Sequence, residues 1–170
     1  ARIINEVKVM QKNNHPNVIK FINSWYNKEK KQVIIITEHL VGGDLSYLLK
    51  KRLDSSIRFN NIELSKMFKD ILSGLQYIHS RRLIHRDLKP GNIGIAKNGD
   101  LKLFDFGLTT KELDIQPVMG SPSLIRQQST TGSDAEGEYS LVGTSDYMSP
   151  ETTNSIYDES VDIYAFGILA

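Results

Sequence analysis

The sequence has no cysteine among its 170 residues. This absence excludes a disulfide framework and a thiolate metal site, and it suits a reducing compartment. No apolar stretch approaches the roughly 20 residues that a membrane-spanning helix needs, and the longest one, residues 33–36, has the length of a strand. The chain also lacks an excess of charge of one sign, because 21 basic and 20 acidic side chains leave a net charge of +1. We therefore expect neither nucleic acid nor a membrane as a partner, and we expect a cytoplasmic location.

The spacing of the apolar residues predicts a mixed α and β chain. In chain order we expect an amphipathic helix that opens the chain and ends at the Asn and Pro residues of 13–17, strands at 18–25 and 32–38, helices at about 45–52 and 62–80, and a buried helix after Asp158.

Two further segments have distinct local signals. Asn98-Gly99 lies between two short apolar runs and predicts a tight type I′ hairpin turn. From about residue 113 to residue 138, Ser, Thr, Gln, Gly and Pro dominate without periodicity. We expect this segment to be disordered and to serve as a solvated tether rather than as a specific docking site.

The stretch LIHRDLKPGN, residues 83–92, places acidic, basic and amide side chains in one short loop. Asn92 follows Asp87 by five residues, and Asp105 comes at the end of the second predicted hairpin strand. Asn92 and Asp105 offer hard oxygen ligands, which suit magnesium rather than zinc. Asp87 is then free to accept a proton or orient a hydroxyl, and Lys89 adds a cation. A base, metal ligands and a counter-charge are together what phosphoryl transfer requires.

Three motifs occur in order and between suitable elements: H-R-D-x-x-x-x-N at 85–92, D-F-G at 105–107 and GTSDYMSPE at 143–151. With them the chain resembles a eukaryotic protein kinase over nearly its whole length. The resemblance implies an α+β, bilobal protein-kinase-like fold, here partial. The end of the small lobe would lie at 1–38, and the hinge and the first half of the mainly helical large lobe at 39–170. It also implies transfer of the γ-phosphate of ATP, with Mg²⁺, to a protein hydroxyl.

The same resemblance assigns roles within the site. Lys89-Pro90 is similar to the serine/threonine class, so the expected substrate is a protein with Ser or Thr. Asp87 would be the catalytic aspartate, with Lys89 beside the γ-phosphate. The other residues expected at the nucleotide are the magnesium ligands Asn92 and Asp105, the hinge residues Glu38 and Leu40, whose backbone would bind adenine, and Asp44 at the ribose or the substrate. A role as a helix N-cap is equally compatible with Asp44.

Regulatory positions are implied in the same way. Glu6 is similar to the small-lobe helix glutamate that pairs with the ATP-anchoring lysine, and Thr144 to the threonine that touches the catalytic aspartate and lysine. Arg86 is typical of kinases whose activation loop is ordered by a phosphate. Ser140 lies at the usual position for that phosphate, with Tyr139 and the serines of the insertion as rivals. The residues that match the stacked regulatory spine are Met10, Phe21, His85 and Phe106.

Some features depart from the family pattern. Gly94 stands where relatives place a large apolar residue beneath the adenine, which removes roughly 1–3 kcal/mol of packing and puts nucleotide affinity in question. The glycine-rich loop and the ATP-anchoring lysine would precede residue 1, and the arginine partner of Glu151 would follow residue 170. We therefore expect a fragment that is neither stable nor active alone.

The subfamily signals are mixed. The stretches YIHSRRLIHRDLKPGN, DFGLTT and GTSDYMSPE resemble the kinases of eukaryotic initiation factor 2 alpha, which implies a stress or translation-regulating role. The stretches FINSW, ITE and YDESVDIYAFG are similar to the with-no-lysine kinases. Two other functions remain open: a catalytically weak pseudokinase scaffold, for which Gly94 leaves room, and a small-molecule kinase, against which the peptide-substrate platform of GTSDYMSPE argues.

Overall fold

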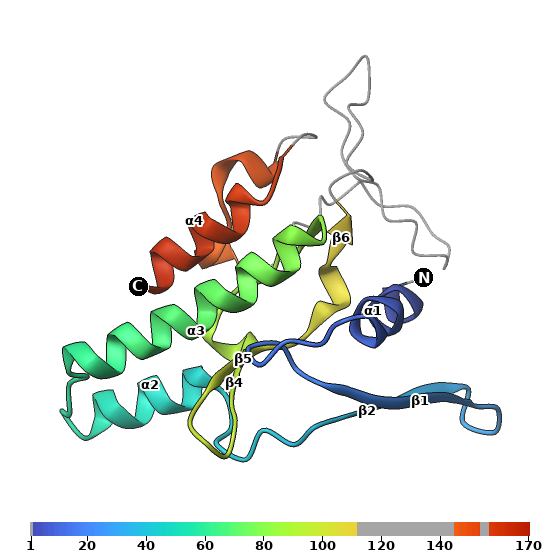
Figure 1. Ribbon diagram of the computed structural model, residues 1–170, viewed down its shortest axis with the longest axis horizontal. Helices are drawn as coiled ribbons and strands as arrows, with labels where there is room; N and C mark the ends of the chain where they lie inside the picture. Colours follow the sequence, from blue (N-terminus) through green and yellow to red (C-terminus); the bar gives the residue numbers. More distant parts are fainter. Residues whose placement is uncertain (1, 112–144, 154–156) are drawn as a thin grey trace, which may run out of the picture.

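The computed structural model describes residues 2–111, 145–153 and 157–170, and Figure 1 shows their arrangement. The helices are α1 (Arg2–Gln11), α2 (Leu45–Asp54), α3 (Asn61–Ser80) and α4 (Ser160–Leu169). The strands are β1 (Phe21–Asn27), β2 (Gln32–Thr37), β3 (Leu83–Ile84), β4 (Ile93–Ile95), β5 (Leu101–Leu103) and β6 (Thr110–Lys111). Short 3-10 helices are η1 (Pro90–Asn92), η2 (Phe106–Leu108), η4 (Ser145–Tyr147) and η5 (Pro150–Thr153). The segment 113–138, for which we predicted disorder, lies outside the described residues.

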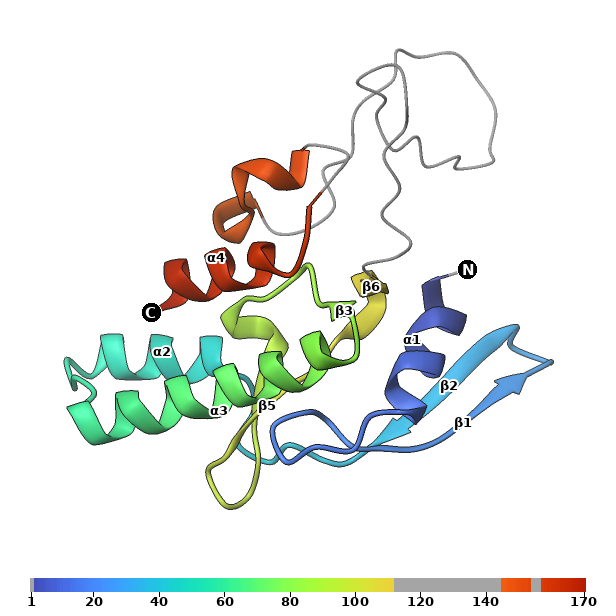
Figure 2. The ribbon, with the colours of Figure 1, turned by 45° about the horizontal axis from the view of Figure 1, so that its top comes forward.

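Helices α2 and α3 run side by side in both views (Figure 1, Figure 2). Helix α3 begins where a capping box satisfies its first amides: the Asn60 side chain accepts from the N–H groups of Ile62 and Glu63, and the Glu63 side chain accepts from the Asn60 N–H. Glu63 also pairs with Arg52 of α2 at 2.6 Å. Glu63 therefore both caps the start of α3 and links α3 to α2.

Strand β1 begins at Phe21, three residues later than the apolar pattern predicted. Val18 and Ile19 do not pair with β2; they lie in the core, where they are 1% and 7% exposed. The Ile19 N–H donates to the Leu103 carbonyl at 2.9 Å, and the Leu103 N–H donates to the Asn17 carbonyl at 2.9 Å. The segment before β1 thus packs along β5, a long-range pairing that apolar spacing cannot distinguish from a hairpin strand.

The turn between β4 and β5 is not the type I′ turn that Asn98-Gly99 predicted. Gly99 adopts a positive φ of 81°, but Asn98 does not. The Gly99 N–H donates to the Ala96 carbonyl, and the Ala96 N–H donates to the Asp100 carbonyl, both at 2.9 Å. The loop is therefore a turn followed by a left-handed glycine, the usual three-residue alternative for a hairpin.

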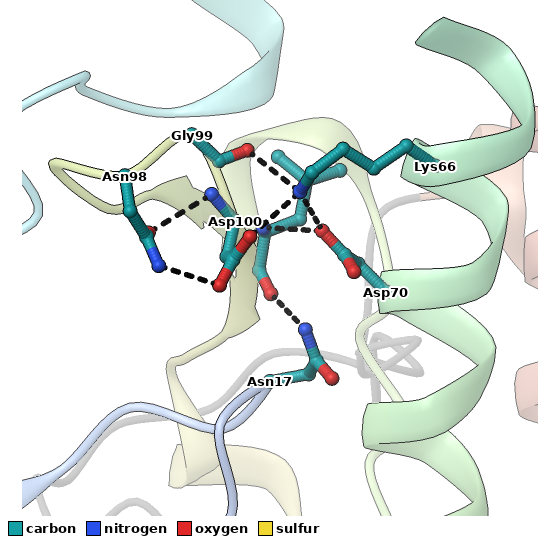
Figure 3. A network of polar contacts seen from close by, with 7 residues as sticks. Asn17, Lys66, Asp70, Asn98, Gly99 and Asp100 are labelled. Atoms are coloured by element: carbon teal, nitrogen blue, oxygen red, sulfur yellow. Dashed lines mark hydrogen bonds and ion pairs between the residues drawn. The ribbon is translucent and has the colours of Figure 1, made fainter. Parts of the chain in front are cut away.

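A polar network ties this hairpin to α3 (Figure 3). Lys66 lies 2.8 Å from Asp70 on the same helix and 2.7 Å from Asp100 across the interface. It also donates to the Gly99 carbonyl at 3.2 Å. The Asp70 carboxylate accepts from the Leu101 N–H at 3.0 Å. Asp105 follows shortly after the end of β5, so these bonds to α3 also hold the part of the hairpin that leads to Asp105.

The hydrophobic core is formed by side chains from the inner faces of these helices and strands. Its largest fully buried side chains include Leu45, Ile71, Leu75, Ile78, Ile84, Leu103 and Phe106.

Helix α4 differs from the buried helix that the sequence predicted: Val161 and Ala165 are buried, whereas Ile163 and Ile168 are 47% and 51% exposed. No described element covers its outer face. Within the described ranges, no helix combines the length and the apolar character needed to cross a bilayer.

Candidate active site

The site is centred on the loop of residues 85–92, called here the catalytic loop, which joins β3 to β4 and ends in η1. Asp162 of α4 holds its first residues. The Asp162 carboxylate is 1% exposed and accepts hydrogen bonds from the backbone N–H groups of His85 at 2.8 Å and Arg86 at 2.9 Å. It also lies 2.8 Å from Nε2 of His79. Charge-assisted bonds of this kind are the stronger ones in proteins, so Asp162 fixes where the loop starts.

Arg86 has an unusual backbone conformation. Its φ is 71°, in the left-handed region, which costs about 1–3 kcal/mol for a residue other than glycine. The bond from its N–H to Asp162 offsets part of that cost. With the backbone reversed at Arg86, the chain presents the next residue, Asp87, toward Lys89 and Asn92.

Asp87 is the acceptor at the centre of the loop. Its Oδ2 lies 2.8 Å from Nζ of Lys89 and 2.8 Å from Nδ2 of Asn92. The Asn92 amide nitrogen also donates to the Asp87 carbonyl at 2.8 Å. The side chain of Asp87 is only 9% exposed and that of Lys89 is 29% exposed. A carboxylate oriented by two donors in a partly dry site can accept a bond from an incoming hydroxyl at its remaining lone pairs.

Asn92 and Asp105 lie at the same end of the β4–β5 hairpin. Ile93 pairs with Leu103 in the antiparallel register, and one step further the Phe104 N–H donates to the Asn92 carbonyl at 3.0 Å. Asp105 follows directly, exposed and with a left-handed φ of 62°. The hairpin therefore places at one end the two residues that the sequence proposed as magnesium ligands.

Behind Asp105, apolar side chains anchor the turn. Phe106 is fully buried, and its ring lies 5.2 Å from the ring of His85. Nε2 of His85 is 3.1 Å from the Phe104 carbonyl. Met10 belongs to the same buried cluster, and Phe21 packs against that cluster. The four residues that resembled a regulatory spine thus lie on the same core.

The linker from Glu38 to Asp44 connects β2 to α2. The Glu38 carboxylate accepts from the Lys20 N–H at 2.8 Å and from Nζ of Lys102 at 2.7 Å. Burial alone would raise the pKa of Glu38, but the hydrogen bonds and charges of Lys102 and Lys20 hold it below its usual value. The Glu38 side chain is therefore engaged within the protein, and its backbone carbonyl accepts a hydrogen bond from Oγ1 of Thr37 at 3.2 Å.

Asp44 is the N-cap of α2. Its carboxylate accepts from the side chain of Ser46 and from the Tyr47 N–H, and these hydrogen bonds lower its pKa. The N-cap role left open by the sequence is confirmed. A contact of Asp44 with a ribose or a substrate remains a prediction.

The regulatory predictions fall mostly beyond the described side chains. Glu6 lies in α1, but its side chain is outside the described residues, as are Ser140 and Thr144. The guanidinium of Arg86 lies 5.4 Å from the ring centre of Tyr157, and its buried Nε makes no hydrogen bond to any residue that the structure describes. Burial raises the pKa of Tyr157, against the opposing charge of Arg86. Arg86 is thus placed beside the aromatic face of Tyr157.

Asp162 is the functional residue that the sequence analysis missed. We identified YDESVDIYAFG only as a subfamily signal, without assigning a role to its second aspartate. One signal was available: an acidic residue among Val161, Ala165 and other apolar residues of a predicted buried helix needs a partner. The partners themselves, 76 and 77 positions earlier in the chain, could not be read from the sequence.

The sequence was also compared with known protein families and with individual proteins. The protein kinase domain family matches residues 1–170, the whole chain. The chain is 33% identical over 171 positions to the probable serine/threonine-protein kinase nek2 of Dictyostelium discoideum, covering 98% of this chain and 36% of that protein. It is 35% identical over 169 positions to the serine/threonine-protein kinase fray1 of the same organism, covering 99% of this chain and 26% of that protein.

The chain therefore belongs to the protein kinase domain family. This confirms the identification made from the motifs, and the mixed α and β architecture fits part of a kinase fold. The chain spans about a third and a quarter of the lengths of these two relatives. Neither relative is named for a translational role, so the subfamily assignment stays a prediction.

Proposed function

We propose that this chain carries the catalytic centre of a serine/threonine protein kinase that transfers the γ-phosphate of ATP to a protein hydroxyl. The observation that carries the proposal is the Asp87 carboxylate, 2.8 Å from both Lys89 and Asn92 and only 9% exposed. In the reaction, a bond forms between the substrate oxygen and the γ-phosphorus, the bond from that phosphorus to the β-phosphate oxygen breaks, and ADP leaves. Asp87 orients the hydroxyl and accepts its proton, while Lys89 offsets charge on the transferring group.

The donor set near Asp87 fits magnesium. The amide nitrogen of Asn92 donates to Asp87, which leaves its oxygen as the ligand atom, and the Asp105 carboxylate is exposed at the same hairpin end. No cluster of three or more His, Cys, Asp or Glu side chains among the described residues could hold a metal ion. Magnesium usually uses one or two protein oxygens together with substrate phosphates and water, so two ligands suffice. The ion, when bound, neutralises phosphate charge.

The nucleotide base would lie against the linker. In this proposal the carbonyl of Glu38 and the N–H of Leu40 take the adenine. The Glu38 N–H already donates to the Lys20 carbonyl at 3.0 Å, whereas the Glu38 carbonyl, which accepts from Oγ1 of Thr37 at 3.2 Å, has a second lone pair. Asp44 would approach the ribose or the peptide while it caps α2.

The first test is phosphate transfer from labelled ATP to a mixed pool of serine- and threonine-containing proteins, using the full-length protein. We expect magnesium-dependent transfer that falls by at least about a thousandfold in Asp87→Asn, because the proton acceptor and the orientation of the hydroxyl are both lost. Asp54→Asn, the same change at an exposed carboxylate, is the matched control and should keep wild-type activity.

The alternative of a pseudokinase scaffold predicts a different result. A folded wild type that binds ATP but transfers no phosphate under any phosphorylation state would contradict the enzymatic proposal and support the scaffold. Equal transfer by wild type and Asp87→Asn would contradict the role of Asp87 alone.

For the subfamily, we propose the kinases of eukaryotic initiation factor 2 alpha, with a stress or translation-regulating role. The support is the likeness of YIHSRRLIHRDLKPGN and DFGLTT to that group. Purified initiation factor 2 alpha should be phosphorylated in preference to a generic substrate. Absence of that preference, together with no ATP-anchoring lysine before Glu6, would favour the with-no-lysine group instead.

A further inference from the structure

The linker between β2 and α2 is bonded directly to β4. The Gly42 N–H donates to the Ile95 carbonyl, and the Ile95 N–H donates to the Gly43 carbonyl, both at 2.9 Å. Asp44 and Gly94 form an isolated antiparallel bridge. In Figure 1 the linker passes beside the β4–β5 hairpin before it enters α2. These bonds set the distance between the linker and Gly94.

Leu40 occupies the space that a side chain at position 94 would fill. A Cβ atom added to Gly94 would lie 3.2 Å from Cγ and 3.3 Å from Cβ of Leu40, and closest of all to its Cδ1. Carbon atoms at rest lie about 3.5–4.0 Å apart, so the two side chains exclude each other. At Gly91, only three residues earlier, an added Cβ would have no neighbour within 4 Å. The glycine at 94 is therefore matched to one particular leucine.

We propose that Leu40 and Gly94 form a size-matched pair that shapes the base-binding part of the nucleotide site. Leu40 supplies from the linker the apolar surface that position 94 lacks, so the glycine does not leave a hole beneath the base. Leu40 is then a specificity-determining residue through its side chain as well as its backbone. This inference rests on the proposed function, because it assumes that the base lies against residues 38–40.

The test is a double-mutant cycle in the full-length protein, with Leu40→Ala, Gly94→Ala and their combination. Magnesium–ATP binding is measured by calorimetry, and thermal unfolding without nucleotide is measured in parallel. Leu40→Ala should weaken ATP binding by about tenfold, as expected for one lost buried aliphatic side chain. Gly94→Ala should weaken it because Leu40 is displaced, and the double variant should be no weaker than Leu40→Ala alone. Gly167→Ala in α4, where an added Cβ would have no neighbour within 4 Å, is the matched control and should bind ATP as wild type does.

An exchange variant, Leu40→Ala with Gly94→Leu, tests the proposal in the other direction. It should recover ATP affinity to within about threefold of wild type, because the same aliphatic volume now comes from β4. If the losses of ATP affinity in Leu40→Ala and Gly94→Ala simply add in the variant that combines them, the proposal is overturned. So would coupling that appears in unfolding but not in ATP affinity, since the pair would then serve packing only. If the folded wild type binds no ATP, the proposed function itself fails, whatever the unfolding cycle gives.

Discussion

Asp162 holds the catalytic loop with both of its carboxylate oxygens. Oδ2 accepts from the His85 N–H and contacts His79, while Oδ1 accepts from the Arg86 N–H. An asparagine at this position keeps one acceptor and places an NH₂ group against a buried donor. We expect Asp162→Asn to lower the free energy of unfolding by about 3 kcal/mol, and to reduce phosphate transfer because Arg86 loses the bond that offsets its strained φ.

Denaturant unfolding and a transfer assay check this prediction on the same samples. Asp158→Asn is the control, since Asp158 is exposed and its carboxylate accepts from the Ser160 N–H at the start of the same helix. A change of less than about 1 kcal/mol in Asp162→Asn would mean that the loop keeps its shape without the second carboxylate oxygen.

Asn13 and Asn17 are equally buried, each 7% exposed, but only one of them has a side-chain partner. Nδ2 of Asn17 donates to the Leu101 carbonyl at 3.0 Å, whereas both amide atoms of Asn13 lack a hydrogen bond in the described part of the chain. We expect Asn17→Leu to cost about 1–3 kcal/mol, because a buried carbonyl loses its donor, and Asn13→Leu to be neutral or stabilising. Midpoints of urea unfolding rank the two variants, and a larger loss at Asn13 would contradict the prediction.

At the scale of elements, the hairpin that carries Asn92 and Asp105 owes its position to α3. Lys66 bonds to the Asp70 carboxylate on its own helix, and it reaches the Asp100 carboxylate and the Gly99 carbonyl across the interface. Its side chain is 48% exposed, so solvent screens the network, and we expect Lys66→Met to lower the free energy of unfolding by only about 1 kcal/mol. Lys69→Met, an exposed lysine of the same helix, is the matched control and should change it by less.

The difference in free energy of unfolding between wild type and Lys66→Met should depend on pH, because Lys66 shifts the pKa of Asp100. The hydrogen bond from Lys66 is the largest influence on Asp100 and lowers the pKa of that carboxyl below its usual 3.8. A lowered carboxyl pKa contributes stability above 3.8 that is lost as the pH falls through the folded-state value. The gap between wild type and Lys66→Met should therefore be present at neutral pH and narrow below about pH 4. Chemical unfolding over pH 3–7 measures it, and a gap that widens in acid would refute the assignment.

At the scale of the whole molecule, activation would couple a distant phosphate to the catalytic loop. The Arg86 guanidinium lies 5.4 Å from the ring centre of Tyr157, and its five N–H groups suit an anionic phosphate. We expect Ser140→Ala in the full-length protein to lower activity by on the order of tenfold or more, because the phosphate that would bond to Arg86 is lost.

Phosphate transfer before and after phosphatase treatment measures this effect, with Tyr139→Phe as the neighbouring control. Wild-type activity that survives phosphatase, or a Ser140→Ala variant that still responds to it, would move the regulatory site to another residue.

The proximity of the candidate site residues could be predicted from the sequence. The order of Asp87, Asn92 and Asp105 sufficed because all three lie within 19 positions, and short chain connections alone bring them to one hairpin end. Helices α2 and α3 were predictable within two residues at each end, because capping and apolar spacing act within one or two turns.

Only the tertiary structure decided what holds those residues in place. Val18 packs along β5 instead of entering a hairpin, Leu40 fills the room left by Gly94, and Asp162 meets a loop 76 positions away. Each of these contacts depends on which segment, distant in the sequence, packs against the residue in the folded chain. Sequence periodicity records which face of an element is apolar, but the partner of that face is chosen by packing of the whole chain.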